Sequence, residues 1–327
     1  MNFRPLLLAA TAAAAAVPGL SAQAQSHWPD KPIRVIVPLP PGGPSDIVLR
    51  SAAEKMQATL KQPLVIDNKP GGGGLIAAQT LLQAPADGYT LLLANTSLLT
   101  INPHTFSKLP YDADKSFKPV TNVLGSAMVM AVNAEHVPAH NVAEFIAWAK
   151  PQGDKVSYAS FTAGNSSHFA GVILNQRAGL QMVHVPFNGT PPAVQNLVGG
   201  QVNAAFLPRL AVKPHVDSGK LRVLAVTSPT RSPLMPGVAT FREQGFPDLE
   251  IYIWAALVAP AATPDAQIAK LNAEFVKVLK SETIREQWRA MDFEPLPSTP
   301  DEFRSFMQAE SKRWAEAVKI SGFKASE

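Results

Sequence analysis

Short apolar strands alternate with helices in the first third of the chain, and no other feature limits the fold as strongly. Strands are predicted at 33–39 (IRVIVPL), 63–68 (PLVIDN) and 89–95 (YTLLLAN), where β-branched and large apolar residues dominate. Apolar residues at helical spacing occupy 46–61, and a second helix, LIAAQTLLQA, follows Gly74. Because parallel strands need a crossover between them, this order predicts an α/β fold with a parallel sheet.

The same alternation returns further along the chain. Asn141 is a suitable N-cap for a helix at 141–150, with Glu144 three residues on. Gly179 suits the end of the helix that begins near Ser167. Strands are expected at 127–133, 155–160, 182–187, 201–207 and 221–228, with a further helix at 192–200. The sequence therefore predicts a second α/β unit.

Two amphipathic helices follow this second unit, at 264–281 and 300–319. Pro264 stands near the first turn of the earlier one, where proline is well tolerated. We expect these late helices to return and pack on the first unit.

The N-terminus has the features of a secretory signal. Arg4 gives a positive start, residues 6–17 are apolar, and Ala22-Gln23-Ala24 fits a small-x-small cleavage site. The alternative, a membrane anchor, is less favoured because the apolar run is too short to span a bilayer. We expect cleavage near Ala24 and a periplasmic protein of about 303 residues, long enough for two domains.

Composition excludes several classes of protein. Removing residues 1–24, which hold Arg4 and no acidic residue, leaves 28 basic (29 − 1) against 25 acidic residues, a formal charge of +3. The charges are interspersed, which gives nucleic acid binding no support. The chain has no cysteine, so its stability must come from its core rather than from disulfides.

Two glycine-rich turns follow the first two predicted strands. In PPGGPSD, Gly42 and Gly43 can expose backbone N–H groups, and Ser45 or Asp46 can cap the next helix, whose N-terminus favours anions. The second turn, NKPGGGG at 68–74, again precedes a helix. The residues alone leave open whether these turns bind a ligand or only connect elements.

A third turn lies in YASFTAGNSSHF, residues 158–169. Gly164 turns the chain, and Asn165, Ser166 and Ser167 offer short polar side chains at a helix start. His168 is expected in the first helical turn. A second anion-binding helix N-terminus and an ordinary cap with a surface histidine both remain possible readings.

Catalytic and metal-binding motifs find little support. The chain has no GxSxG, no HExxH and no phosphate-binding GxxxxGK[ST]. His136 and His140 are four apart, but Pro138 between them breaks a regular helical face. An enzyme such as a hydrolase or isomerase remains the alternative hypothesis, because His168 and His184 flank a plausible cleft.

Several stretches, in order over nearly the whole mature chain, form a specific set. They are WPDKPIRVIVPLPPGGPSD, NKPGGGG, ADGYTLLLAN, LPYDADKSFKPVT, GNSSHFAG, VPFNGTPPAVQNLVGGQVN and GKLRVLAVTSPTRSP, then Trp254 with ALVAPAATP. This set resembles the substrate-binding proteins of tripartite tricarboxylate transporters, also called Bug-type periplasmic receptors.

The resemblance implies a type II periplasmic-binding-protein fold, with two α/β domains around a cleft and two crossover strands between them. It implies a first domain of 25–127 plus 232–327 and a second of 128–231. It also implies a monomeric receptor, not an enzyme. Such a receptor would capture a small organic, amino or aromatic acid for the membrane permease of a tripartite tricarboxylate-type transporter. No cofactor, metal or nucleic acid is expected.

The implied ligand-binding residues lie where strands end. One carboxylate would meet PPGGPSD, through backbone N–H groups, the Ser45 hydroxyl and bridging water, and the other end would meet 163–167. Asp46 is expected to cap its helix or accept a hydrogen bond, because a free carboxylate would repel an acid. The expected set is Leu39, Pro41, Gly42, Gly43, Ser45, Asp46, Asn95, Thr96, Ala163, Gly164, Asn165, Ser166, Ser167, His168, Asn188, Gly189 and Arg209.

This chain departs from the family pattern at several of these places. Leu39 stands where an aromatic residue is usual, and Phe187-Asn188-Gly189 where Tyr-Lys-Gly is common. Thr162, Asn165, Asn196 and Asn203 also replace the usual Gly, Ser, Asp and Asp. The departures weaken a simple dicarboxylate assignment and favour a more apolar or aromatic acid. Arg209 is a candidate cation for its carboxylate, or else a surface arginine.

Overall fold

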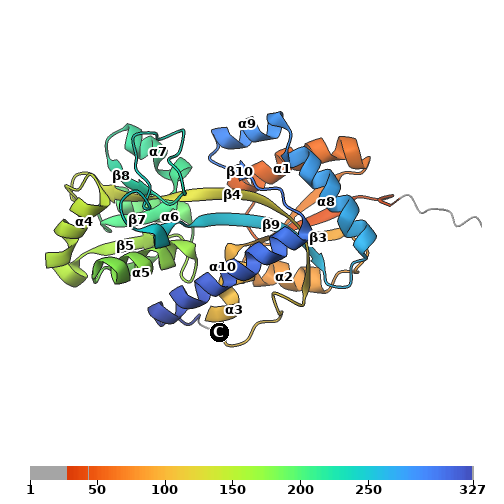
Figure 1. The fold of residues 1–327 in the computed structure, drawn as a ribbon, viewed down its shortest axis with the longest axis horizontal. Helices are drawn as coiled ribbons and strands as arrows, with labels where there is room; N and C mark the ends of the chain where they lie inside the picture. The colour runs from red at the N-terminus through yellow and green to blue at the C-terminus, as the bar shows by residue number, and fades with distance from the viewer. Residues whose placement is uncertain (1–27, 43, 326–327) are drawn as a thin grey trace, which may run out of the picture.

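Two α/β lobes lie side by side and are joined by long strands (Figure 1). The computed structural model describes residues 28–42 and 44–325. The predicted signal segment, residues 1–24, and Gly43 lie outside this part of the chain. None of the helices within it is both long and apolar enough to cross a membrane.

The first lobe contains the predicted parallel strands. β1 (Ile33–Val37) lies between β2 (Leu64–Asn68) and β3 (Thr90–Asn95), and it is parallel to both. Their connections contain α1 (Pro44–Leu60), the short η1 (Gly72–Gly74) and α2 (Leu75–Leu82). After β3 the chain continues into η2 (Ser97–Ile101) and α3 (Asn102–Thr105). The prediction that these three strands form a parallel sheet is confirmed.

Two long strands join the lobes. β4 (Phe117–Asn133) pairs with β9 (Tyr252–Pro260) along its first part. Along its last part it pairs with β7 (Ala204–Pro208) and β8 (Leu221–Val226). All of these pairings are antiparallel, and β9 is also antiparallel to β3, so the complete sheet is mixed. The strand expected at 127–133 is therefore only the second-lobe end of a 17-residue strand.

The second lobe repeats the α/β arrangement. Its strands are β5 (Ser157–Ser160), β6 (Val183–Pro186), β7 (Ala204–Pro208) and β8 (Leu221–Val226). Its helices are α4 (Val142–Ala149), η3 (Lys150–Lys155), α5 (Ser166–Ala178), α6 (Thr190–Val198) and α7 (Arg209–Asp217). β5 is parallel to both β6 and β7. The caps predicted at Asn141 and Gly179 are confirmed.

The C-terminal elements contact both lobes. They are η4 (Pro247–Leu249), α8 (Asp265–Leu279), α9 (Glu282–Ala290), β10 (Glu294–Pro295) and α10 (Pro300–Ser321). α8 packs on α1 in the first lobe, as expected. The end of α10 instead buries Trp314 and Val318 in the second-lobe core, beside Phe169. The domain limits at 127/128 and 231/232 stay a prediction.

Gly171 is expected to be the most sensitive glycine inside a helix of the second lobe. A Cβ there would overlap the ring of the buried Tyr158. Gly171→Ala should therefore lower the free energy of unfolding by about 1–3 kcal/mol, although alanine is the better helix former. The matched control is Gly237→Ala, where a Cβ meets open space. Urea unfolding that ranks the two variants equally would contradict this packing.

Candidate ligand-binding site

The ends of β1, β2 and β3 meet at one edge of the first-lobe sheet. Asn68 donates from Nδ2 to the Leu39 carbonyl (2.9 Å), and the Lys69 N–H donates to the Val37 carbonyl (2.7 Å). A Cβ on Gly74 would lie 3.0 Å from Leu98 and 3.6 Å from Pro38. The turns after the three strands therefore form one continuous surface, and we call residues 38–42, 44–46, 68–74 and 95–98 the first-lobe turns.

The buried side chain of Asp46 holds the PPGGPSD turn in place by accepting hydrogen bonds. Its side chain is only 2% exposed, and it accepts hydrogen bonds from the Gly42 N–H (3.0 Å), from Asn68 Nδ2 (3.0 Å) and from Arg50 Nε (2.9 Å). The expectation that Asp46 accepts hydrogen bonds is confirmed. The expectation that Gly42 offers its N–H to a ligand is wrong, because that donor is already used by Asp46.

The pKa of Asp46 reflects the same contacts. Burial raises the pKa, but hydrogen bonds from Arg50, Gly42 and Asn68 outweigh burial and hold it below the usual value. The carboxylate is therefore ionised at neutral pH, with its charge balanced inside the turn. Its oxygens face donors of the protein rather than a bound acid.

The residues at the end of β3 are also engaged within the protein. Asn95 Oδ1 accepts from the Leu98 N–H (2.9 Å) and so starts the η2 turn. The buried Thr96 hydroxyl donates to the Trp254 carbonyl (3.2 Å) and accepts from the Trp254 N–H (3.0 Å). Both side chains thus position the floor between β3 and β9.

A matching surface forms at the ends of β5 and β6 in the second lobe. The Asn165 side chain caps α5 by accepting from the Ser167 and His168 N–H groups (3.0 and 3.1 Å) and from the Ser167 hydroxyl (2.7 Å). The Gly189 N–H donates to the Phe161 carbonyl (2.8 Å), which joins the two turns. We call residues 161–168 and 187–189 the second-lobe turns.

Two stacked histidines support the second-lobe turns. The rings of His168 and His184 lie 3.7 Å apart at 9°, and His168 Nδ1 accepts from the Gly164 N–H (3.1 Å). His184 Nε2 lies 2.7 Å from the Ser160 hydroxyl, which donates to the Thr162 carbonyl (3.1 Å). Ser160 is fully buried, so this Ser–His contact is not placed to attack a ligand.

Acidification should destabilise the protein through this pair. Burial, with the neighbouring His184 charge, lowers the pKa of His168 to about 3, and burial lowers that of His184 to about 4, from the usual 6.5. The unfolded chain therefore binds the protons first, and stability falls as pH drops below about 6.5. From pH 7.5 to 5.0 we expect a loss of about 3–4 kcal/mol. Urea unfolding of His184→Gln should show about half of that loss.

The C-terminal end also reaches the second-lobe turns. The Phe323 ring packs edge-on against His168, with ring centres 5.0 Å apart, and a Cβ on Gly164 would lie 2.6 Å from Phe323. The Ala325 N–H then donates to the Thr105 carbonyl in the first lobe (2.9 Å). This tail thus contacts both lobes next to the turns.

Arg209 directly follows β7, which is parallel to β5, so it lies at the same sheet edge as the second-lobe turns, and it forms an ion pair. Its Nε donates to the Asp292 carboxylate, which follows α9 in the first-lobe part of the chain. Both side chains are largely buried, at 8% and 14% exposed. Burial raises the pKa of Asp292, although the contact with Arg209 opposes the shift. Among the residues described, no hydrogen bond or ion pair joins Arg209 to either set of turns.

The remaining predicted residues keep polar groups available. No hydrogen bond to another described residue uses the side chains of Ser45, Ser166 or Asn188. Asn188 is exposed, as are Ala163, Leu39 and Pro41, while Ser45 is half-buried. The predicted set therefore divides into residues that shape the turns and residues that can meet a ligand. Gly43 lies outside the described residues.

Asn196 and Asn203, where the family pattern has Asp, both have structural roles. Asn203 Oδ1 accepts from the Ser157 N–H (2.8 Å), and Asn196 Nδ2 donates to the Pro192 carbonyl (2.9 Å). Within residues 28–42 and 44–325, no three acidic, histidine or cysteine side chains gather as metal ligands would.

Two α/β lobes with facing strand-end turns, joined by long strands, define a solute-binding protein of the periplasmic type. Residues 48–323 match the model of the tripartite tricarboxylate transporter family receptor. The chain is also 34% identical to the protein BugT of Bordetella pertussis over 320 residues, covering 97% of this chain and 98% of BugT. The chain therefore belongs to the tripartite tricarboxylate transporter receptor family.

Solved structures agree with this assignment. R. palustris Rpa4515 with adipate superimposes with a TM-score of 0.82 at 28% identity, covering 91% of this chain and 99% of that one. MatC from Rhodopseudomonas palustris with bound malate gives 0.77 at 30% identity, covering 89% and 100%. The protein is thus a solute-binding receptor with the fold that its sequence predicted.

Proposed function

We propose that the protein captures a small carboxylic acid between its lobes in the periplasm and delivers it to the membrane permease of a tripartite tricarboxylate-type transporter. The observation that carries the proposal is the pairing of two prepared turn surfaces, one at the strand ends of each lobe. Strand ends of this kind are where α/β sheets bind ligands. The adipate and malate named for two solved relatives support an acid as the ligand.

The contacts with the acid come from small polar groups. In the first lobe, Ser45 offers a hydroxyl at the start of α1, where the helix favours negative charge. In the second lobe, Ser166 and the N-terminus of α5 offer the same chemistry, and Asn188 adds an amide. A ligand that contacts both sides favours the closed arrangement, because only that arrangement provides both sets of contacts.

The body of the acid is apolar in this proposal. Leu39 is 37% exposed in the first-lobe turns, and Phe161 and Phe187 are half-buried in the second-lobe turns. Leu39 stands where the family pattern has an aromatic residue, and Phe187 stands where the pattern has tyrosine. We therefore favour an aliphatic or aromatic acid over a short hydroxylated one such as malate.

A ligand screen tests the proposed function directly. Native mass spectrometry of the purified mature protein is expected to reveal a bound acid, and a thermal-shift panel should then identify its class. At a hundredfold excess over the dissociation constant, a true ligand stabilises the fold by about 2.7 kcal/mol. If no aliphatic, aromatic or amino acid raises the melting temperature, the proposal fails. Turnover of the bound acid that His168→Ala abolishes would instead favour an enzyme.

A further inference from the structure

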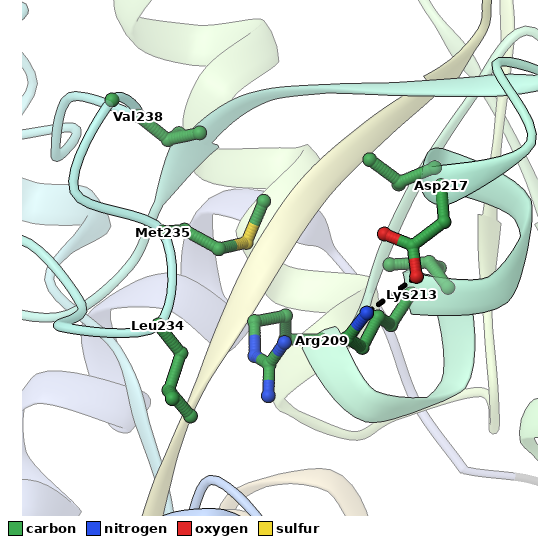
Figure 2. A pocket seen from close by; sticks show the side chains of 9 residues that line it. Arg209, Lys213, Asp217, Leu234, Met235 and Val238 are labelled. Carbon is green, nitrogen blue, oxygen red and sulfur yellow. Dashed lines mark hydrogen bonds and ion pairs between the residues drawn. The ribbon is translucent and has the colours of Figure 1, made fainter.

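A small cavity opens beside Arg209, and none of the residues of either set of turns lines it. It has a volume of about 230 Å³, and it lies between α7 and the loop at 234–238 of the second lobe. Figure 2 shows Arg209 between Leu234 and Met235 on one side and the helix carrying Lys213 and Asp217 on the other. At about 30 Å³ per water, the space suits a short organic molecule.

Arg209 has unused hydrogen-bond donors in this cavity. The residue is only 7% exposed, and its described hydrogen bonds use Nε alone, toward Asp292. A guanidinium carries five N–H groups, so both Nη atoms remain without a partner among the residues described. Two Nη donors in one plane match the two oxygens of a carboxylate.

The other walls are apolar or already balanced in charge. Lys213 pairs with Asp217, four residues on in α7, as the dashed line in Figure 2 marks. Leu234, Met235 and Val238 form the opposite wall, and Leu234 is 47% exposed. One end of the cavity therefore offers guanidinium donors, while the remainder suits hydrocarbon.

We propose that this cavity is a second binding site, which takes an aliphatic monocarboxylate with its carboxylate on Arg209 Nη1 and Nη2. Because Nε of the same guanidinium holds Asp292 of the first-lobe part, occupation of the cavity is coupled to a contact between the lobes. The site goes beyond the proposed capture of an acid at the turns, since none of the turn residues lines it.

Methyl NMR of the mature protein tests the second site. The full sequence has eight methionines, and Met1 lies in the predicted signal segment, so the mature protein gives few methionine methyl signals. Met235→Leu assigns the signal of the methionine that lines the cavity. Titration with hexanoate should shift the Met235 methyl signal saturably in the millimolar range, whereas hexylamine should not. Arg209→Gln should weaken hexanoate binding, followed by the Met235 signal, roughly tenfold or more, because it removes the charged guanidinium group. A Met235 signal that does not move, or that moves equally in Arg209→Gln, overturns the proposal.

Three further variants keep the test decisive. Leu234→Trp, at an exposed wall position, should fill the cavity and weaken hexanoate binding without unfolding the protein. Asp292→Asn should strengthen binding, because it removes the carboxylate that competes for Arg209. Asp46→Asn, which disturbs only the first-lobe turns, should leave the Met235 response in place. Loss of the response in Asp46→Asn would assign it to the cleft and contradict a second site.

Discussion

Asp46→Asn is expected to weaken binding of the captured acid about a hundredfold. The carboxylate accepts from the Gly42 N–H and from Asn68 Nδ2, and hydrogen bonds to a charged acceptor contribute about 1.5–3 kcal/mol each. In the variant, an amide NH2 group replaces one carboxylate oxygen and faces an N–H donor, so that hydrogen bond is lost. The turn then no longer holds the shape that binds the ligand. A loss of about 3 kcal/mol corresponds to about a hundredfold in affinity. Isothermal titration calorimetry with the identified acid measures it.

Arg50→Gln is the matched control for this prediction. Arg50 donates to the same carboxylate, but its side chain is 48% exposed, and exposed ion pairs contribute only about 0–1 kcal/mol. We expect the affinity of the Arg50→Gln variant for the acid to stay within about fivefold of the wild-type affinity. Equal losses in Asp46→Asn and Arg50→Gln would mean that net charge, rather than turn geometry, controls binding.

Gly164→Ala should give the second large effect, on both stability and binding. The backbone of Gly164 has φ of 73°, and a Cβ would lie 2.6 Å from the Phe323 ring. The left-handed conformation costs an alanine about 1–2 kcal/mol, and overpacking adds about 1–3 kcal/mol. Urea unfolding should therefore show a loss of about 2–5 kcal/mol. Acid binding should weaken as well, because the turn before α5 shifts.

Phe323→Ala separates the two causes. In the double variant Gly164→Ala/Phe323→Ala the clash is absent, so the combined loss should be smaller than the sum of the single losses. The cost of the left-handed backbone conformation at position 164 remains whether residue 323 is Phe or Ala. Strictly additive losses would show that the tail does not pack on this turn in solution.

Local sequence signals predicted the strands that end in the turns. β1 is an apolar run followed by Pro38, and β2 and β3 are runs that end at Asn68 and Asn95. The caps at Asn141 and Gly179 depend on their nearest neighbours. The first part of β4 and all of β9 were missed. Their stability comes from pairing with each other, as Phe117 pairs with Pro260, and a window of local sequence does not contain that partner.

Helices α7 and α9 were missed for different reasons. α7 contains Pro214, which argues against a helix, and α9 is a short polar segment that buries only Ile284 and Trp288. Packing on the rest of the protein decides both cases. A short local window shows neither the lobe that each helix covers nor the side chains that receive it.

The candidate site likewise contains one feature that local sequence predicts and several contacts that it does not. The hydrogen-bonding role expected for Asp46 follows from its place at a helix start. The stack of His168 on His184, the contact of Phe323 with Gly164 and the pair of Arg209 with Asp292 join residues that lie 16 to 159 positions apart. Such contacts depend on the relative placement of elements, which no short motif contains.

Hydrogen–deuterium exchange with and without the identified acid tests the central claim most directly. Capture between the lobes requires that one ligand protect both sets of turns, since each provides part of the contacts. We predict slower exchange on binding at the backbone amides of Gly42, Ser45 and Asp46 and at those of 163–168, in the same titration and with the same midpoint. Protection confined to one lobe, or found only outside both sets of turns, would contradict capture of the acid between them.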